Sequence, residues 1–517
     1  MKKIFLAVVV VMACSGIINA QSSVSFGFDK DIILPKMNDY VRMLGADSDG
    51  FYALRMNEND DLFLDYFNGA SLDRENTYQM ALPMVNGIKA EYVSMFYLSG
   101  KLVLFTQVLN NTIKEKSLYI QHVNNTGQII GEPTIIGKLT NQNISVDFHV
   151  ELTPNKQNVF VWYNRPFQTY NDEPFYFKVY DPNMKEIYNN TIKLPLVGKA
   201  FEIDQIKIAN SGNVYMLARV SPDARQLKRM KNVVYDYELL MFEIASGNVN
   251  SYDIKNKKFQ LVDVIFGMDD NENIDAYGFL VRKGKTNYEA IHHQKLNTKT
   301  GQFFSGDAKK SDYVFTKTEV PEFRADRLTK IYDQIYDYKL LDVVYLSNGG
   351  SALVAEHRNY WMDSVIVPGS KEVIYSDYFR FNDVLVAYCS PDNNMEWMTR
   401  IPKSQYSFND WGKFSSVAYL GVGEKIFLFY NDNSKNIKLL QKQDLNGMNY
   451  KEISSPGRSG VAVSVSIFSD GKAHGTELFA KNKKYKIVPE LANEFNGRHY
   501  LYSQNGQKVK FALFTGR

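Results

Sequence analysis

Cysteine, an excess of one charge and long apolar runs are all scarce in this chain of 517 residues. Of the two cysteines, Cys14 lies in the first apolar segment and Cys389 stands alone further on, so no disulfide is expected to join two parts of the folded chain. No apolar run after the first one is long enough to span a bilayer. A large buried core, which this length permits, is therefore expected to hold the fold together.

The charge balance excludes one class of partner. Removal of residues 1–20 takes away Lys2 and Lys3 and no acidic residue. The remaining chain has 58 basic and 57 acidic residues, a net charge of +1. Proteins that bind nucleic acid or acidic lipid through electrostatics carry a basic excess. We therefore expect no nucleic-acid partner.

Signatures of common catalytic and ligand sites are also missing. The sequence has no GxSxG, HExxH, CxxC or GxxxxGK[ST] motif, so it lacks the patterns of many hydrolase, metal and nucleotide sites. Its 57 acidic residues cannot be paired by spacing into the two carboxylates of a glycosidase. The sequence therefore indicates no catalytic residue, no metal and no cofactor, and it favours a protein that is not an enzyme.

The first residues, "MKKIFLAVVVVMACSGIINAQ", have the pattern of a secretory signal peptide: two lysines, an apolar run and small residues before a cut. Cleavage after Ala20 leaves residues 21–517, which we expect to form one domain with no transmembrane segment. The alternative uses "VMAC" as a lipobox, with cleavage before Cys14 and a lipid on that cysteine.

A sequence pattern of two apolar strands joined by a polar turn recurs along the chain. Runs rich in Val, Ile, Tyr and Phe alternate with Gly, Asn, Asp and Pro, which is typical of antiparallel sheets. Copies include "VSMFYLSGKLVLFTQ", "LDVVYLSNGGSALVAE" and "VSVSIFSDGKAHGTELFA". The turns of the eight copies are centred on Gly50, Gly100, Asn158, Gly212, Asn273, Gly350, Gly423 and Gly471. Their spacing of 48 to 77 residues indicates a repeated structural unit.

A second hairpin follows each copy, so one repeat contains four antiparallel strands. Examples are "FLDYFNGAS", "KLLQKQDLNGMNY" and "HYLYSQNGQKVKF". Four-stranded units around an axis form a β-propeller, in which ring closure protects the sheet edges. The sequence therefore predicts an all-β propeller of eight four-stranded blades, with seven as the alternative. The segment "SVSFGFDKDIIL" is predicted to supply a closing strand.

The long connections fall in positions that share one face of a propeller, which we call the loop face. They lie between the second and third strands of a blade or between blades, at Asn164–Pro174, Val220–Val234, Glu319–Tyr338, His357–Asn382 and Ile401–Phe414. Apolar residues at helical spacing predict one short helix within Arg324–Leu340. The stretch Glu356–Trp361, "EHRNYW", mixes chemistries as an active site does, but the repeat places it at the start of an ordinary loop.

The loop face is predicted to carry the contacts with a partner. Tyr, Trp, Phe and Arg dominate binding hot spots, and flat aromatic rings also stack on sugars. The candidate residues in these connections are Arg165, Phe167, Tyr170, Arg358, Tyr360, Trp361, Tyr378, Arg380 and Trp411.

The two-lysine leader, the glutamine after the cut and the abundance of Asn, Lys, Tyr and Phe resemble exported proteins of Bacteroidota-type bacteria. The last residues, "HYLYSQNGQKVKFALFTGR", lack the "YPNP"-like entry of a surface-sorting domain. This resemblance implies a periplasmic or outer-membrane-associated protein, with the cell surface as an alternative. We expect a non-catalytic interaction propeller that serves an outer-membrane or secretion assembly, with an envelope protein such as an outer-membrane protein as partner. The alternative is a propeller that binds or cleaves glycans.

Overall fold

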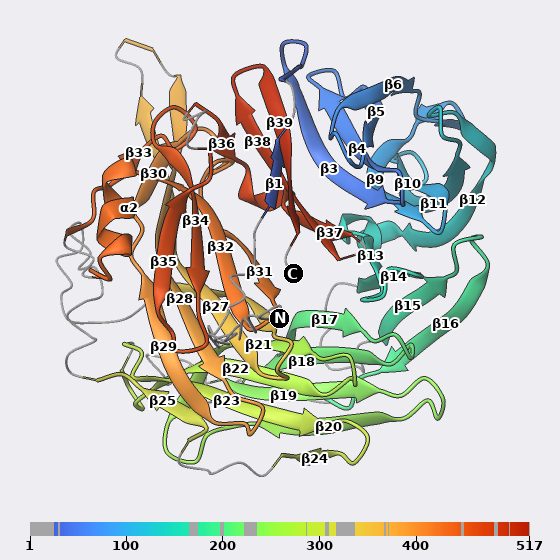
Figure 1. The fold of residues 1–517 in the computed structure, drawn as a ribbon. Helices are drawn as coiled ribbons and strands as arrows, with labels where there is room; N and C mark the ends of the chain where they lie inside the picture. Colours follow the sequence, from blue (N-terminus) through green and yellow to red (C-terminus); the bar gives the residue numbers. More distant parts are fainter. Residues whose placement is uncertain are drawn as a thin grey trace, which may run out of the picture.

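The computed structural model describes residues 25–28, 31–164, 174–196, 201–221, 235–285, 287–304, 310–316, 337–366, 369–370, 372–445, 449–479, 484–495 and 497–515. These residues form eight sheets of at least four strands each and a small hairpin of β7 (Met84–Val85) and β8 (Ile88–Lys89). The sheets follow one another in chain order around a centre, and Figure 1 shows β13, β17, β31 and β37 nearest the middle. The fold is thus an all-β propeller.

The first four blades are formed by consecutive antiparallel strands. Blade one contains β3 (Asn38–Ala46), β4 (Gly50–Asn57), β5 (Leu62–Asn68) and β6 (Arg74–Met80), and blade two contains β9 (Glu91–Leu98), β10 (Lys101–Asn110), β11 (Glu115–Val123) and β12 (Ile129–Thr140). Blade three, which follows the 3-10 helix η1 (Asn141–Ser145), contains β13 (His149–Leu152), β14 (Val159–Asn164), β15 (Pro174–Tyr180) and β16 (Glu186–Lys193). Blade four contains β17 (Phe201–Ile208), β18 (Val214–Val220), β19 (Asp236–Phe242) and β20 (Val249–Ile254).

Blades five to seven carry additions to this plan. Blade five contains β21 (Gln260–Met268), β22 (Ile274–Val281), β23 (Ala290–Asn297), β24 (Gln302–Phe303) and β25 (Asp312–Val314). Blade six contains β26 (Tyr338–Tyr345), β27 (Ser351–Ile366), β28 (Val373–Cys389) and β29 (Met395–Ile401), and it is extended by β30 (Gln405–Phe408) and β33 (Ile453–Ser454). Blade seven contains β31 (Ala418–Val422), β32 (Lys425–Asp432), β34 (Val461–Ile467) and β35 (Ala473–Glu477).

Blade eight joins the two ends of the described chain, which confirms the predicted closing strand. Its members are β36 (Lys486–Ile487), η4 (Pro489–Leu491), β37 (Asn493–Phe495), β38 (Arg498–Asn505) and β39 (Lys508–Thr515). The outer side of β39 pairs with β1 (Ser25–Phe28) and β2 (Ile32–Ile33). Red β39 beside blue β1 marks this closure in Figure 1. Because the outermost strand comes from the other end of the sequence, the ring is closed by backbone pairing.

Hydrophobic cores between neighbouring blades confirm the count of eight. Phe51 of blade one packs with Tyr500 and Phe511 of blade eight, which is the contact that completes the circle. The other seven junctions each have a buried cluster of their own. Side chains alternate between the two sides of a strand, so the inner strands of a blade supply both cores that flank it. An eight-bladed ring follows, and the alternative of seven is wrong.

The seventh and eighth repeats are divided differently from the sequence prediction. The hairpin around Gly471 is β34–β35, the outer half of blade seven, and not the first hairpin of an eighth copy. The segment "KLLQKQDLNGMNY", predicted as a hairpin, begins inside helix α2 (Ser434–Gln441). The Asn433 side chain caps the helix by accepting from the Lys435 amide, and Ile437 and Leu440 are buried one turn apart.

The stretch Glu356–Trp361 is strand and not loop, which corrects the sequence prediction. It lies within the 16 residues of β27, which pair with the 17 residues of β28 in one long hairpin. The predicted helix within Arg324–Leu340 lies mostly outside the described residues. Tyr338 begins strand β26, so the last residues of that range are not helical. Over the part of the chain that is described, no helix is both long and apolar enough to cross a membrane.

Candidate functional site

The β27–β28 hairpin extends past its own blade on the loop face. Strand β26 pairs with β27 only up to His357, whereas β27 and β28 remain paired from Arg358 with Phe381 to Ile366 with Val373. Among the described strands, only β28 pairs with β27 beyond His357. In Figure 1 this gold hairpin rises beyond β30 and β33 at the upper left. An open strand edge of this kind is a ready template for pairing with another chain.

One side of the hairpin carries a row of aromatic rings. Trp361 stacks on its cross-strand neighbour Tyr378, with the ring centres 5.3 Å apart. Tyr406 of β30 lies 6.3 Å from both rings, because β30 pairs with the base of β28. The Arg380 guanidinium lies 5.6 Å from the centre of the Tyr406 ring, and its Nη2 is 3.7 Å from Glu452 Oε2. These contacts stiffen the base of the hairpin.

The opposite side holds a second aromatic row. The Tyr360 and Phe379 ring centres are 5.2 Å apart, and the Tyr360 hydroxyl donates to Asp377 Oδ1 at 2.7 Å. Phe381 continues the row towards the propeller. Gly412 lies so close to it that a Cβ atom there would be 3.1 Å from the Phe381 ring. The absence of a side chain at Gly412 thus lets the loop after β30 lie against this face.

Beyond these rows, the outer third of the hairpin exposes apolar side chains on both sides. Met362, Ile366 and Tyr375 lie on one side and Val365 and Ile374 on the other, according to the strand register. The exposed fraction is 66% for Ile366 and 61% for Tyr375. Exposed apolar side chains that gather in one place indicate an interaction site, whereas single ones do not. We call these five residues the hairpin tip.

The candidates named from the sequence divide into three groups. Arg165, Phe167 and Tyr170 lie outside the described residues. The structure brings five others together on the one hairpin: Arg358, Tyr360, Trp361, Tyr378 and Arg380. Trp411 lies in the loop after β30 and is 85% exposed. Sequence reasoning missed the hairpin tip because four of its five residues are not of the aromatic and arginine types typical of hot spots, and Tyr375 was not singled out among the tyrosines.

The loop that carries Trp411 has an unusual backbone. Asn409, Trp411, Gly412 and Ser416 all have positive φ, at 51°, 56°, 66° and 71°. This region is costly for a bulky side chain such as tryptophan, so the surrounding structure must impose it. An Asp410 side chain that accepts from the Gly412 amide at 3.0 Å helps to hold the turn. The loop keeps a large aromatic ring in solvent at an energetic cost.

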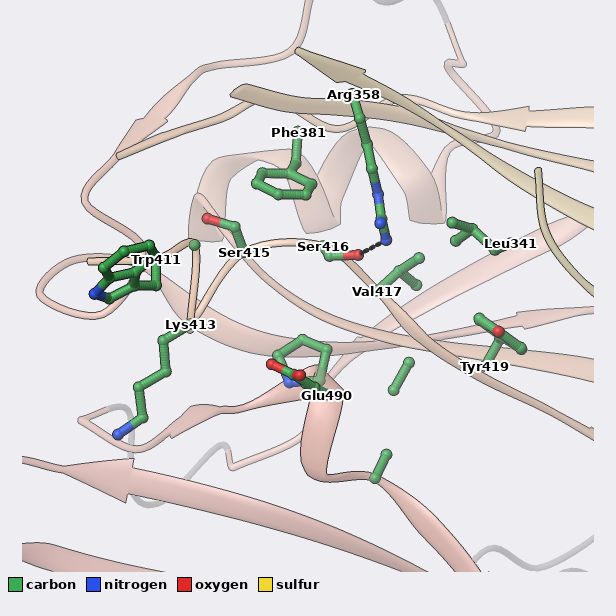
Figure 2. A pocket seen from close by; sticks show the side chains of 14 residues that line it. Leu341, Arg358, Phe381, Trp411, Lys413, Ser415, Ser416, Val417, Tyr419 and Glu490 are labelled. Carbon is green, nitrogen blue, oxygen red and sulfur yellow. Dashed lines mark hydrogen bonds between the residues drawn. The ribbon is translucent and has the colours of Figure 1, made fainter. Parts of the chain in front are cut away.

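A cavity of about 620 Å³ opens beside this loop, on the inner side of blades six to eight. Leu341 and Tyr419 reach it from the inner strands β26 and β31, and Glu490 from η4 of blade eight. Figure 2 shows Arg358 extending towards Ser416, with Phe381 beside it and Trp411 and Lys413 on the same side. We call it the axial cavity. It lies next to the second aromatic row of the hairpin.

A buried polar network supports the wall of the axial cavity. The fully buried Glu356 places Oε1 2.5 Å from Lys403 Nζ and Oε2 2.6 Å from Arg358 Nε. Ser416 donates to Glu356 Oε2 at 2.7 Å, and Lys403 donates to Gln405 Oε1 at 2.8 Å. Burial lowers the pKa of Lys403, and the neighbouring Glu356 carboxylate opposes this shift. The network ties the base of the hairpin to blade seven.

Carboxylates around the axis do not assemble the pair that a glycosidase needs in this cavity. Among the described residues that line the axial cavity, only Glu490 carries a carboxylate. A neighbouring cavity of about 350 Å³ contains Asp342 and Glu494. Asp342 pairs with Lys207 of blade four at 3.6 Å, and Glu494 lies 3.6 Å from His499. Asp342 is thus engaged in an ion pair between blades, whereas Glu494 lies beside an imidazole whose pKa burial lowers.

One buried cluster resembles a catalytic relay, but it is closed off from solvent. His293 lies 3.2 Å from Cys389 Sγ through Nδ1 and 2.7 Å from Asp275 Oδ1 through Nε2. Cys389 is only 1% exposed, and its burial raises the pKa of the thiol far above its usual range. A thiol that stays protonated is a poor nucleophile. We assign this cluster to the junction of blades five and six.

Comparisons with known proteins give similarity of architecture only. No protein-family model and no curated protein matches the chain. The WD40 domain of SCAP from fission yeast is 8% identical over 95% of this chain and 98% of its own, with a TM-score of 0.37. Sqt1 of Saccharomyces cerevisiae is 7% identical over 95% and 99%, with a TM-score of 0.40. A europium-containing methanol dehydrogenase is 8% identical over 95% and 93%, also with a TM-score of 0.40.

Proposed function

We propose that this protein is a non-catalytic interaction propeller of the bacterial envelope, a subunit or accessory factor of an outer-membrane or secretion assembly. The partner is an envelope protein that binds the β27–β28 hairpin. The single observation that carries the proposal is the hairpin tip, where apolar side chains are exposed on both sides of a two-stranded ribbon. The signal-peptide pattern of the first residues supports a periplasmic or outer-membrane-associated location.

The energetics of the hairpin favour a bound state. Burying an exposed aliphatic or aromatic side chain contributes roughly 1.5 to 3 kcal/mol. Stacking of Trp361 on Tyr378 fixes the base of the hairpin before any partner arrives, so less conformational entropy is lost on binding. The open edge of β27 offers backbone hydrogen bonds as well, which suits a partner that adds an extended strand. A rigid ribbon with apolar ends and a free edge is thus suited to protein contact.

A variant with four serines tests the proposal. Val365→Ser, Ile366→Ser, Ile374→Ser and Tyr375→Ser together should weaken partner binding by about 100-fold or more, because truncated hot-spot residues cost roughly 2 kcal/mol or more. The thermal midpoint should change little, since all four side chains are exposed. The measurement is recovery of partner by affinity purification from envelopes solubilised in several detergents, followed by titration of the recovered partner.

The matched control is Ile130→Ser with Ile135→Ser on β12 of blade two. These residues are also exposed aliphatic side chains on a strand, but they lie far along the ring from blade six. Partner recovery should equal that of the wild type. Recovery of the protein alone from every detergent, or equal recovery with the four-serine variant, would contradict the proposed function.

A glycan-binding propeller is the second candidate, and Trp411 is the observation that favours it. An exposed indole at the rim of a cavity is a platform on which the apolar face of a sugar ring can stack. A panel of immobilised bacterial and plant polysaccharides should then retain the wild-type protein and release Trp411→Ala. If the two proteins behave alike on every polysaccharide, this candidate is wrong. A glycan-cleaving enzyme also needs a second carboxylate, which the described lining of the axial cavity does not supply.

A further inference from the structure

A buried carboxylate holds together the hydrogen-bonded network behind the axial cavity. Glu356 is the one carboxylate shared by Lys403 and Arg358, and Lys403 is fully buried against its Oε1 atom. Asp432, the other buried acid that acts on Lys403, is hydrogen-bonded by the Asn433 amide and the Asn436 side chain. Arg358 is the charged member of this network that reaches the cavity wall, where its side chain is 35% exposed.

The Arg358 guanidinium is held in place on three sides. Its Nε bonds to Glu356, its Nη2 donates to Ser416 Oγ at 2.5 Å, and the group lies 5.2 Å from the centre of the Phe381 ring. The described residues give Nη1 no hydrogen-bond partner, and the side chain lines the axial cavity. Figure 2 shows the guanidinium at the cavity with its bond to Ser416. The Arg358 side chain is therefore already ordered, so binding an anion costs little further side-chain conformational entropy.

The other charged groups at the cavity are arranged differently. Lys413 Nζ lies 2.7 Å from Asp39 Oδ1 of blade one, so the Asp39 carboxylate already compensates its charge. Glu490 is exposed, and its carboxylate can accept hydrogen bonds from hydroxyl or amide donors of a ligand. Trp411 adds a flat apolar surface at the rim, on a backbone whose positive φ stores strain. Strain of this kind concentrates where a ligand is held.

We propose that the axial cavity binds a ligand that combines one carboxylate, neighbouring hydrogen-bond donors and a flat apolar face. The carboxylate pairs with Arg358, the donors meet Glu490, and the flat face packs on Trp411. Sugar acids and acidic peptide segments both have this chemistry. The inference goes beyond the proposed protein contact, because it concerns the cavity and not the hairpin tip, and it deepens the glycan-binding candidate by specifying a carboxylate.

The test is calorimetric titration of the intact mature protein with two pairs of probes. One pair is a hexuronic acid trisaccharide and its uncharged hexose counterpart. The other is the peptide acetyl-Trp-Gly-Glu-amide and the same peptide with glutamine. We expect saturable binding of the carboxylate member of at least one pair, at least 10-fold tighter than its neutral counterpart, because a charge-assisted hydrogen bond is lost in the neutral form. If only the sugar pair shows this difference in affinity, the ligand is a sugar acid, and if only the peptide pair shows it, the ligand is an acidic peptide segment.

Two variants locate the binding. Arg358→Gln should weaken it by about 10-fold or more and remove the preference for the carboxylate. Trp411→Ala should weaken it by about 5-fold while keeping that preference, and its exposed side chain makes a folding defect unexpected. Arg219→Gln, in an ion pair with Glu202 on blade four, is the control and should bind as the wild type.

Two results would overturn the inference. One is the absence of saturable binding by both carboxylate probes in the millimolar range. The other is binding that Trp411→Ala leaves unchanged, since this variant does not disturb the network around Glu356. Loss of partner recovery in the four-serine variant with intact probe binding would separate the protein contact from the cavity, so the two proposals fail independently.

Discussion

Deletion of residues 21–33 is expected to lower the free energy of unfolding by at least about 4 kcal/mol and to promote aggregation. The deletion removes β1 and β2, which together pair six residues with β39. A typical hydrogen bond contributes about 1 kcal/mol net, and the exposed edge of β39 becomes a site for association between chains. Urea unfolding followed by fluorescence, together with light scattering, measures both effects. An unchanged urea midpoint would show that the ring does not depend on this closure.

The point variant Asp31→Asn separates the closing strand from its ion pairs. Asp31 Oδ1 accepts from the Tyr485 hydroxyl at 2.7 Å, and Oδ2 lies 3.0 Å from Lys508 Nζ. The Tyr485 hydrogen bond and then Lys508 hold the pKa of the Asp31 carboxyl well below its usual range. A lowered pKa in the folded state stabilises the fold above the unfolded value of about 4, and this contribution disappears as the pH falls through the folded pKa. Asp31→Asn should thus be destabilising at pH 7 and approach the wild type in acid, with a smaller effect than the deletion.

Glu356→Gln is expected to lower the free energy of unfolding by about 3 to 5 kcal/mol. The change keeps the shape of the side chain but removes the carboxylate that is in direct contact with the buried Lys403 and with the Arg358 guanidinium. Removing one partner of a buried ion pair has a cost of this size because the other charge loses its compensation. The urea midpoint, measured beside the wild type, is the readout.

Two further variants check the cause. Adding Lys403→Met to Glu356→Gln should restore part of the loss, because the uncompensated charge is gone and only hydrogen bonds are missing. Glu202→Gln removes the carboxylate of a surface pair with Arg219 and should change stability by no more than about 0.5 kcal/mol. If Glu356→Gln behaves like Glu202→Gln, the buried network does not stabilise the base of the hairpin.

Most of the fold follows from local signals in the sequence. The turns around Gly50, Gly100 and Gly350 lie between inner strands as predicted. Gly100 has a positive φ of 81°, and at Gly50 and Gly350 a Cβ atom would clash with the neighbouring strand. The division of blades seven and eight does not follow from such signals. The apolar residues Ile437 and Leu440 fit either a strand or a helix, and the Asn433 cap together with burial against blade seven decides for the helix.

The candidate site was predicted in composition but not in geometry. Trp361 and Tyr378 were both expected on the loop face, but only the register of a 16-residue strand shows that they stack. Strands of this length are uncommon, so the same residues were expected to form a loop. Glu356 and Lys403 meet although 47 residues separate them, and no spacing rule connects two such positions.

The positive φ of Trp411 also lies beyond prediction from the sequence, because tryptophan is disfavoured there. The loop between β30 and β31 adopts it under tertiary constraints, including the close approach of Gly412 to Phe381. A backbone conformation that opposes local preference in this way is set by tertiary contacts and does not follow from the local sequence.

Site-specific photo-crosslinking in intact cells tests the central claim most directly. A benzophenone amino acid is placed at Ile366 in the hairpin tip, and in a second strain at Ile130 on β12, both of which are exposed. The proposed function predicts one dominant adduct with an envelope protein from position 366 and none of that adduct from position 130. No adduct from position 366, or the same adducts from both positions, would contradict it.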